Sequence, residues 1–484
     1  MTVGEFAATV KSELPYSPNM QQEMLIGALA RFCAGLQTDP ERDAPSTPSA
    51  DLAFVVNGYA GTGKTSLMSA LVRALTKMKI NVVLMAPTGR AAKVFSRYSG
   101  FPAATIHRRI YRHSLRGERP GLKDNRDSNT LYIVDEASMI GSAVSSGAYS
   151  SDLLGDLITY VFAGTNNRLI LMGDTAQLPP VGDAESPAMD PSFLREIGLK
   201  VSTATMTRVV RQGARSGIMA NAVNIRRMMT EHPDRIPTPI TDGFDDVQAI
   251  TALDMAEAID CAYRNAGIDD TIIITRSNRR AADFNHAIRR EVLYLEEELA
   301  QNEPLLVVKN NYYWMRVARR RNPDFIANGD IMRVMRVIGT EMKYGFRFAD
   351  VELEPVESAT DSDADSKIAP LQAKIFLETL GSEHPALPVE RQRLLWERLI
   401  QTEYPDHPNP MQALADNPYW NALQTKYAYC VTCHKAQGGQ WSQVFVDVAY
   451  INPDAVGPDL YRWMYTATTR ARHNLTYLVD MRPE

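Results

Sequence analysis

Gly58-Tyr-Ala-Gly-Thr-Gly-Lys-Thr65, in letters GYAGTGKT, follows the apolar run Phe54–Val56 and precedes the helix-compatible run SLMSALVRAL. A glycine-rich loop between a strand and a helix lets backbone N–H groups approach phosphate oxygens, and the helix N-terminus adds a favourable dipole. Lys64 would place its charge at the β- and γ-phosphates of ATP, and Thr65 would bind Mg²⁺. The stretch therefore predicts a P-loop nucleotide site. The residues assigned to the nucleotide are Gly58, Ala60, Gly61, Thr62, Gly63, Lys64, Thr65 and Ser66.

Short apolar runs recur along the chain, separated by longer stretches that suit helices. The runs of the first half are Phe54–Val56, Val82–Met85, Leu131–Val134 and Leu169–Met172, and those of the second half are Thr271–Ile274, Val444–Val448 and Leu475–Val479. Such runs alternating with helices are typical of parallel sheets that are covered on both faces. We therefore predict an α/β fold with two parallel-sheet domains.

A different pattern interrupts the second series of strands. Three segments have the composition of strands of a small β module: Leu305–Val308, Ile331–Val334 and Phe346–Leu353. The dipeptide Asn328-Gly329 is typical of a tight turn between strands. The polar segment VESATDSDADSK and the helical stretch VERQRLLWERLIQTEY follow. We expect a first domain at 1–200 with a candidate hairpin insertion at 112–129, a second at 201–300 and 426–484, and an insertion at 301–425.

Composition limits the class of protein. The net charge of −5 excludes a uniformly basic coat for nucleic acid but permits a local basic groove. No run approaches the roughly 18 apolar residues of a membrane span. Four cysteines are too few for a disulfide framework, and the Cys430–Cys433 pair suits a buried strand better than a zinc site. We expect a cytoplasmic protein that has no membrane partner.

Acidic and amide side chains follow two of the first-half strands. Asp135 stands at the end of the run Leu131–Val134, where it would hold Mg²⁺, and Glu136 would orient and deprotonate an attacking water. A carboxylate base favours hydrolysis over transfer to a small acceptor. Gln177, in GDTAQLPPVG after Leu169–Met172, would then lie beside the γ-phosphate and sense its presence.

Eight segments in one order carry a family resemblance: GYAGTGKTS, APTGRAAK, TIHRRIY, YIVDEASMI, GDTAQLPPVG, VVRQ, TCHKAQGGQW and YTATTRAR. They resemble the motifs of superfamily 1 DNA helicases, most closely the RecD/Dda-like branch. The resemblance runs from about Pro18 to about Leu478, without a clear match at 356–425. It implies two RecA-like domains and an SH3-like β insertion. It also implies ATP- and Mg²⁺-driven movement along single-stranded DNA in the 5′-to-3′ direction, with duplex unwinding in repair, recombination or replication.

The resemblance also assigns roles to residues. Arg211 and Arg470 would reach the γ-phosphate, and together with Lys64, Glu136 and Gln177 they form the expected catalytic set. Gln22 would read the adenine edge, with Gln21 as the alternative register. The residues expected to contact DNA are Pro87, Thr88, Arg90, Thr105, His107, Thr432 and His434. For either histidine, a buried hydrogen-bonding role explains the residue type equally well.

Three other functions remain open at this stage. The first is an RNA-directed helicase. The second is a nucleotide-switched DNA-binding subunit of a nuclease or recombination complex, against which Glu136 argues. The third is a small-molecule P-loop kinase, which the second domain and the two arginine motifs disfavour. We expect the chain to function as a monomer on single-stranded and duplex DNA, with a nuclease or recombination protein as a candidate partner.

Overall fold

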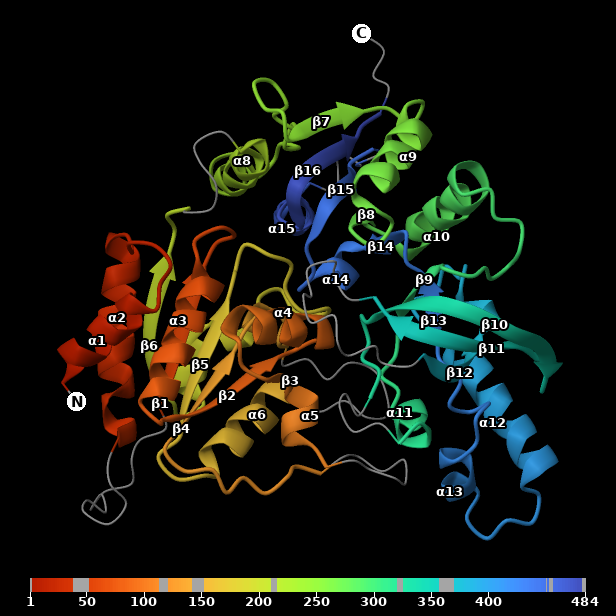
Figure 1. Ribbon diagram of the computed structural model, residues 1–484, viewed down its shortest axis with the longest axis horizontal. Coiled ribbons are helices and arrows are strands. Elements are labelled where there is room, and N and C mark those ends of the chain that lie inside the picture. Colours follow the sequence, from red (N-terminus) through yellow and green to blue (C-terminus); the bar gives the residue numbers. More distant parts are fainter. Residues whose placement is uncertain are drawn as a thin grey trace. The chain divides into compact units, whose positions relative to one another are not determined.

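The computed structural model describes residues 2–37, 52–112, 121–141, 152–209, 216–319, 325–356, 370–449, 451 and 456–480. The chain forms two compact units, Met1–His113 with Arg119–Arg215, and Ser114–Glu118 with Ser216–Glu484. Figure 1 labels their helices and strands.

The first unit is built on a parallel sheet, which within the described residues has the strand order β3-β2-β4-β5-β1-β6 (Figure 1). Its strands are β1 Leu52–Gly58, β2 Asn81–Ala86, β3 Ala103–Thr105, β4 Thr130–Val134, β5 Arg168–Gly173 and β6 Lys200–Met206. All four apolar runs predicted for this half are strands of the sheet. The unit extends past the expected boundary at residue 200 because β6 pairs with β1 along its whole length.

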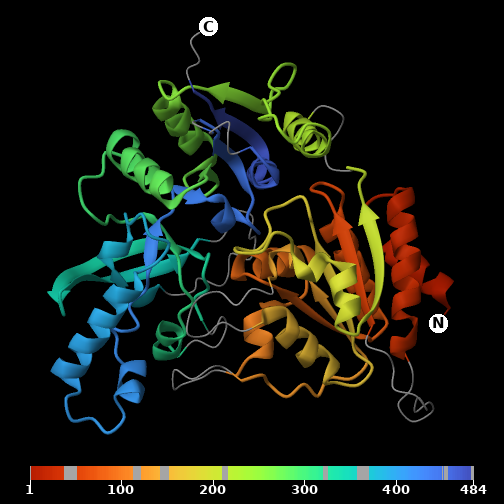
Figure 2. The ribbon, with the colours of Figure 1, turned by 180° about the vertical axis from the view of Figure 1, so that it is seen from behind.

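Both faces of this sheet are buried, because alternate residues of each strand point to opposite sides. On β1, Phe54 and Val56 pack into one core, and Ala53 and Val55 into the other. The first core includes α1 Val3–Ser12, α2 Met20–Cys33, α3 Lys64–Lys77 and α4 Gly89–Ser99; the second includes α5 Ile106–Ile110, α6 Leu153–Phe162 and α7 Pro191–Glu196. Figure 2 gives these helices and strands from behind. Short 3₁₀ turns occupy Ala34–Gln37, Ala137–Met139 and Pro187–Met189.

The candidate hairpin insertion at 112–129 lies partly outside the described residues, which resume at Gly121. The described part of this insertion contacts other residues of the first unit. Leu122 forms an antiparallel bridge with Tyr111, and the Asn125 amide donates to the Tyr160 carbonyl at 2.8 Å. The hairpin insertion therefore stays a prediction.

The second unit contains two sheets. The parallel one has the order β14-β8-β15-β16-β7, and the antiparallel one has the order β12-β11-β10-β9-β13, both within the described residues. The parallel strands are β7 Val247–Ile250, β8 Thr271–Thr275, β14 Cys430–Thr432, β15 Trp441–Asp447 and β16 Ala471–Leu478. The helices of this part are α8 Gly217–Glu231, α9 Met255–Ala266, α10 Asn278–Ala287, α14 Cys433–Ala436 and α15 Pro458–Thr468, with a π turn at Ile288–Val292. The predicted fold class, α/β with a parallel sheet in each of two domains, is confirmed.

The antiparallel sheet is the predicted β insertion. Its strands are β9 Pro304–Val307, β10 Ile331–Lys343, β11 Phe346–Pro355, β12 Leu371–Phe376 and β13 Thr425–Tyr427. Tyr344 and Gly345 join β10 to β11 with φ of 53° and 70°, as a two-residue hairpin turn of the I′ type requires. The predicted strands are present, and the comparison with an SH3-like topology stays a prediction.

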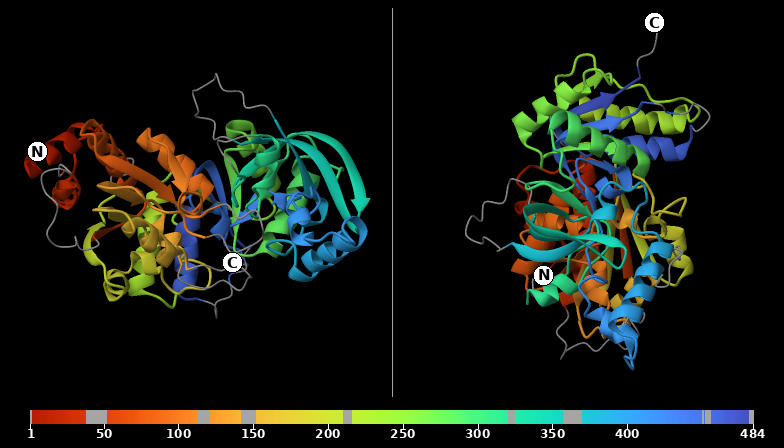
Figure 3. Two further views of the ribbon diagram at one scale, coloured as in Figure 1. Left: turned by 90° about the horizontal axis from the view of Figure 1, so that it is seen from below. Right: turned by 90° about the vertical axis from the view of Figure 1, so that its right-hand side faces the viewer.

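Helices cover one face of this insertion. α12 Val389–Glu403 lies beside the antiparallel sheet (Figure 3). Its Leu395 and Leu399 belong to one apolar cluster with Phe346 and Phe348 of β11. α11 Tyr313–Val317, α13 Pro410–Ala415 and a 3₁₀ turn at Leu377–Thr379 complete the module. Its other face shares a core with α9 and α10, so the two sheets of this unit are joined by continuous apolar packing.

The cysteine pair lies at the predicted buried strand. Cys430 is on β14, Cys433 begins α14, and both are buried. Burial raises the pKa of the Cys433 thiol to about 12 and the pKa of Cys430 well above its usual value. Both side chains therefore stay as neutral thiols at neutral pH.

No helix in the described ranges has both the length and the apolar composition that crossing a membrane requires.

Candidate nucleotide and nucleic-acid sites

The P-loop joins β1 to α3 at the carboxyl end of the parallel sheet. Gly61 and Gly63 have φ of 75° and 84°, a left-handed conformation that favours glycine. The ammonium group of Lys64 donates to the carbonyl oxygens of Gly58 and, at 3.0 Å, of Tyr59. These neutral acceptors hold the charge on the loop, where phosphate oxygens would be stronger partners.

Gln22 is buried directly against this loop. Its amide nitrogen donates to the Thr62 carbonyl at 3.2 Å, and its amide oxygen accepts from the Asn19 N–H at 3.0 Å. A β-carbon added to Gly63 would lie 2.8 Å from the Gln22 nitrogen, so the contact requires glycine there. Gln21 points elsewhere and accepts from the N–H groups of Thr207 and Arg208 at 3.0 Å. Adenine recognition by Gln22 remains a prediction. In the structure, the Gln22 side chain contacts the P-loop.

Asp135 and Glu136 follow β4 at the same edge of the sheet. Asp135 is only 8% exposed, and burial together with the neighbouring Glu136 raises its pKa to about 7, against the opposing effect of Lys64. Glu136 has a φ of 52°, in the left-handed region that costs a non-glycine residue about 1–2 kcal/mol. Strained backbone of this kind is typical of functional positions.

The donor set of this edge suits Mg²⁺. Mg²⁺ in nucleotide sites takes one or two carboxylates together with phosphate oxygens and waters. Asp135 supplies a buried carboxylate beside a second acid, and a divalent cation would relieve the unfavourable burial of that charge. The hydroxyl of Thr65, on the first turn of α3, is the second predicted ligand.

β5 lies between the P-loop strand and the strand that carries Asp135. Leu171 of β5 is in register with both Val55 of β1 and Val134 of β4. The stretch GDTAQLPP therefore begins between β1, which leads into the P-loop, and β4, which leads into Asp135. Gln177 is 6% exposed, and its amide oxygen has no hydrogen-bond partner among the described residues.

Ser138 is a residue that the sequence analysis did not single out. Its hydroxyl is buried without a hydrogen-bond partner in the described part of the chain, like the Gln177 oxygen. A β-carbon on Gly173, the last residue of β5, would lie 2.8 Å from the Ser138 nitrogen. The segment after Glu136 thus packs directly on the end of β5, and its only signal in the sequence was proximity to Glu136.

Gln177→Met is expected to lower the stimulation of ATP hydrolysis by DNA without lowering stability. A buried acceptor without a partner costs about 1–3 kcal/mol, so its removal leaves the free energy of unfolding unchanged or higher. Denaturant unfolding and hydrolysis rates with and without oligonucleotide give the two quantities. A loop with a purely structural Gln177 would show the reverse, lower stability with normal stimulation.

Of the two predicted arginines, the structure describes Arg470. Arg211 lies outside the described residues. Arg470, between α15 and β16, is 3% exposed, and its guanidinium donates to the Thr466 carbonyl at 3.0 Å, the Gly439 carbonyl at 3.2 Å and the Thr469 hydroxyl at 3.2 Å. All of these acceptors are neutral. A buried cation held by neutral groups retains the charge that a phosphate would neutralise.

The three threonines predicted to contact DNA share one position, the residue before a helix that follows a parallel strand. Thr88 accepts from the Ala91 N–H at 3.2 Å at the start of α4, and Thr105 accepts from the Arg108 N–H at 3.2 Å at the start of α5. β2 and β3 are neighbours, so these two threonines lie on one edge. Thr432 is the N-cap residue of α14, and its side chain forms no capping hydrogen bond. Pro87 and Arg90, beside Thr88, are half-buried.

The two predicted histidines have different surroundings. His107 is half-buried on α5 with its ring centroid 5.6 Å from that of Tyr111, and burial lowers its pKa. The imidazole is therefore neutral at pH 7 and would contact a phosphate through a hydrogen bond rather than an ion pair. His434 is exposed on α14.

Thr88→Asp is expected to preserve stability and to weaken binding of single-stranded DNA about tenfold or more. Asp caps a helix at least as well as Thr, but its charge would repel a phosphate by about 1–4 kcal/mol at 4 Å. Thermal unfolding and titration of a labelled oligothymidine measure both effects. Thr88→Ser is the matched control and should behave like the native chain. Native affinity in the Asp variant would contradict a phosphate contact at this position.

Comparisons with known proteins find two matching family models and several curated relatives. Residues 46–236 match a family model described as an AAA domain, and residues 427–478 match a UvrD-like helicase C-terminal domain. The ATP-dependent RecD2 DNA helicase of Deinococcus radiodurans is 35% identical over 172 residues, which are 35% of this chain and 21% of that protein. The ATP-dependent DNA helicase dda of Enterobacteria phage T4 is 23% identical over 294 residues, 58% of this chain and 62% of that protein.

A solved structure of the Pif1 helicase from Bacteroides, in complex with ADP-AlF3 and ssDNA, is 14% identical with a TM-score of 0.43, and the match covers 93% of this chain and 91% of that chain. The chain spans less than two thirds of either curated relative, 21% of RecD2 and 62% of Dda. The first family model includes Lys64, Asp135 and Gln177, and the second includes Thr432, His434 and Arg470. The family models and the two curated relatives confirm the resemblance to superfamily 1 helicases of the RecD/Dda-like branch.

Proposed function

We propose that the chain is an ATP- and Mg²⁺-dependent DNA helicase that moves 5′-to-3′ along single-stranded DNA and separates duplex. The observation that carries the proposal is the edge of the first sheet. There the P-loop, the Asp135–Glu136 pair and the buried Gln177 follow β1, β4 and the strand between them. This order supports a single site in which a phosphate-binding loop, a general base and an amide act together.

The residues of this site have distinct roles in hydrolysis. Lys64 exchanges its loop carbonyls for the β- and γ-phosphates of ATP, and Glu136 orients a water and takes its proton. Mg²⁺, held by Thr65 and Asp135, supplies positive charge to the phosphates when bound. Arg470 and Arg211 stabilise charge on the transferred phosphoryl group. Gln177 links the state of the γ-phosphate to the segment beyond β5.

The strand is held by its phosphates, through Pro87, Thr88, Arg90, Thr105 and His107 in the first unit and Thr432 and His434 in the second. Hydroxyl and neutral imidazole donors suit contacts that do not depend on base sequence. Alternating grip during the ATP cycle would produce steps, and opening one base-pair step costs about 1.4 kcal/mol. We place this activity in the cytoplasm, in repair, recombination or replication, by a monomer that has a nuclease or recombination protein as a candidate partner.

Unwinding of matched duplexes with a 5′ or a 3′ single-stranded tail tests the proposal. With ATP and Mg²⁺, the 5′-tailed DNA should open and the 3′-tailed DNA should not, and Lys64→Ala should abolish both opening and hydrolysis. Opening of the 3′-tailed duplex alone would refute the polarity. Equal action on the matched RNA would refute DNA specificity, and binding of ATP without DNA-stimulated hydrolysis would refute a motor.

A further inference from the structure

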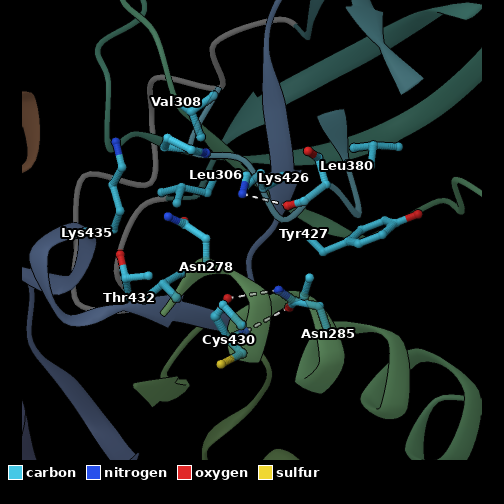
Figure 4. Close-up of a pocket in the computed structure, with 15 residues that line it drawn as sticks. Asn278, Asn285, Leu306, Val308, Leu380, Lys426, Tyr427, Cys430, Thr432 and Lys435 are labelled. Carbon is cyan, nitrogen blue, oxygen red and sulfur yellow. Dashed lines mark hydrogen bonds between the residues drawn. The ribbon is translucent and has the colours of Figure 1, made fainter. Parts of the chain in front are cut away.

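A pocket with both apolar and polar side chains in its lining lies within the second unit, where the chain passes from the antiparallel sheet to the parallel one (Figure 4). Its walls come from α10, β9, β13 and the segment from β14 to α14, and it encloses about 360 Å³ of space that includes open solvent. Leu306, Val308 and Leu380 form apolar parts of the wall. The pocket belongs neither to the P-loop nor to the arginine motifs.

Two lysines from different elements reach this pocket. The Lys435 amine donates to the Asn328 side-chain oxygen at 2.6 Å, and the Lys426 amine donates to the Ser382 carbonyl at 2.8 Å. Both acceptors are neutral, and no ion pair with a carboxylate is formed by either lysine within the described ranges. Each ammonium carries three N–H donors, so both retain donors for a further acceptor.

The charge of Lys435 acts on the Lys426 amine. Burial lowers the pKa of Lys435 to about 8, and burial together with the charge of Lys435 lowers the pKa of Lys426 to about 8. Two neighbouring half-buried cations without a counter-ion destabilise the native state, because desolvation and like-charge repulsion both oppose them. An anion that entered the pocket would remove that cost.

The other polar groups of the pocket are donors or are neutral. The Thr432 hydroxyl does not cap α14, and Figure 4 shows Asn278 and Thr432 on the same side of the pocket as Lys435. Asn285 is different, because its side chain exchanges two hydrogen bonds of 2.9 Å with the backbone of Cys430 and serves the fold. None of the described residues that line the pocket is Asp or Glu.

We propose that this pocket binds a backbone phosphate of the single strand through Lys426, Lys435 and Thr432. The inference rests on the proposed function and adds two lysines to the residues expected to contact DNA. Three features carry it: two amines without an acidic partner, an uncommitted hydroxyl at the end of a parallel strand, and a lining without carboxylates. The ligand class is a phosphate, which either a nucleic-acid strand or free inorganic phosphate would supply.

The first experiment compares two double variants that each remove two positive charges from this unit. Lys426→Met with Lys435→Met empties the pocket of cations and keeps the apolar stems. Arg264→Gln with Arg393→Gln is the matched control, because these arginines are exposed and pair with Asp260 and Glu397 on helix surfaces. Oligothymidine affinity, without ATP, is measured for both over a series of salt concentrations.

The pocket variant should have a smaller salt dependence than the native chain. Each phosphate contact contributes about 0.7 to the slope of log affinity against log salt for single strands, so loss of this one contact reduces the slope by about 0.7. That corresponds to about fivefold in affinity for a tenfold change in salt. The control should keep the native slope. If the native chain binds the oligonucleotide and the pocket variant keeps its slope, this inference fails alone; if the native chain does not bind, the proposed function fails as well.

Two further readouts separate a ligand site from a structural one and a strand from free phosphate. The melting temperature of the pocket variant should be unchanged or higher, because two unfavourable charges are gone, whereas a drop would show a structural role and overturn the proposal. Amine labelling at pH 8 with mass spectrometry should show protection of Lys426 and Lys435 by oligothymidine, with the exposed Lys79 still labelled. Protection by inorganic phosphate but not by the oligonucleotide would assign a free-phosphate site and overturn the strand contact.

Discussion

Arg470→Ala is expected to lower DNA-stimulated ATP hydrolysis by about 10³–10⁵ in kcat, the effect of losing an arginine that stabilises charge on a transferred phosphoryl group. The guanidinium is 3% exposed, and its three acceptors, two carbonyls and a hydroxyl, are neutral. It therefore carries a charge that no group in its own unit neutralises by an ion pair within the described residues. Steady-state hydrolysis and nucleotide titration measure kcat and ATP affinity, and the latter should change little.

Arg472 provides the control, because it lies two residues further along and has a structural partner. Its guanidinium donates to both oxygens of Asp270, at 2.6 and 2.7 Å. Arg472→Ala should lower the melting temperature and leave kcat per folded molecule near the native value. Arg470→Lys keeps a charge without the fork and should remain strongly impaired. Hydrolysis by Arg470→Ala within tenfold of the native rate would remove Arg470 from the catalytic set.

Glu136→Gln is expected to lower the hydrolysis rate by about 10²–10⁴ while ATP and DNA binding persist. The amide has the shape of the carboxylate but cannot take a proton from water. Single-turnover hydrolysis, measured after the variant is saturated with ATP, isolates this step. A rate near that of the native chain would exclude Glu136 as the general base.

The backbone of Glu136 gives this prediction a control of its own. With φ at 52°, a glycine would adopt the same conformation without strain. Glu136→Gly should therefore raise the free energy of unfolding by up to about 1–2 kcal/mol while it abolishes hydrolysis. Chemical denaturation distinguishes this outcome from an ordinary destabilising loss, in which activity and stability fall together.

The strands that could be predicted from the sequence are the apolar ones, because parallel strands buried on both faces consist of continuous apolar runs. β6 was not predicted, because Lys200–Met206 is polar and largely exposed at the edge of its sheet. Without this strand, the boundary of the first domain was expected at residue 200, where β6 begins. The P-loop and the Asp135–Glu136 pair could be predicted because each is local in the sequence.

Other parts of the sites depend on contacts between distant residues. Gln22 meets Thr62 across 40 positions, and Lys426 shares a pocket with Asn278 from α10. No local pattern marks such pairs, since only the folded sheets bring them together. The unpaired oxygens of Gln177 and Ser138 were likewise invisible, because a missing hydrogen-bond partner is a property of the packed structure.

The sheet order of the first unit also constrains how the protein is made. β1 carries the P-loop and is the first strand of the sheet in the chain, yet its neighbours β5 and β6 are the last two. During synthesis β1 has no partner strand until more than half of the rest of the unit has been made, because β5 and β6 come later in the chain. Pairings this distant in sequence form slowly. A nascent chain should therefore gain nucleotide binding only after β5 and β6 have left the ribosome. Until then the apolar strand β1 is unpaired, which favours binding by chaperones.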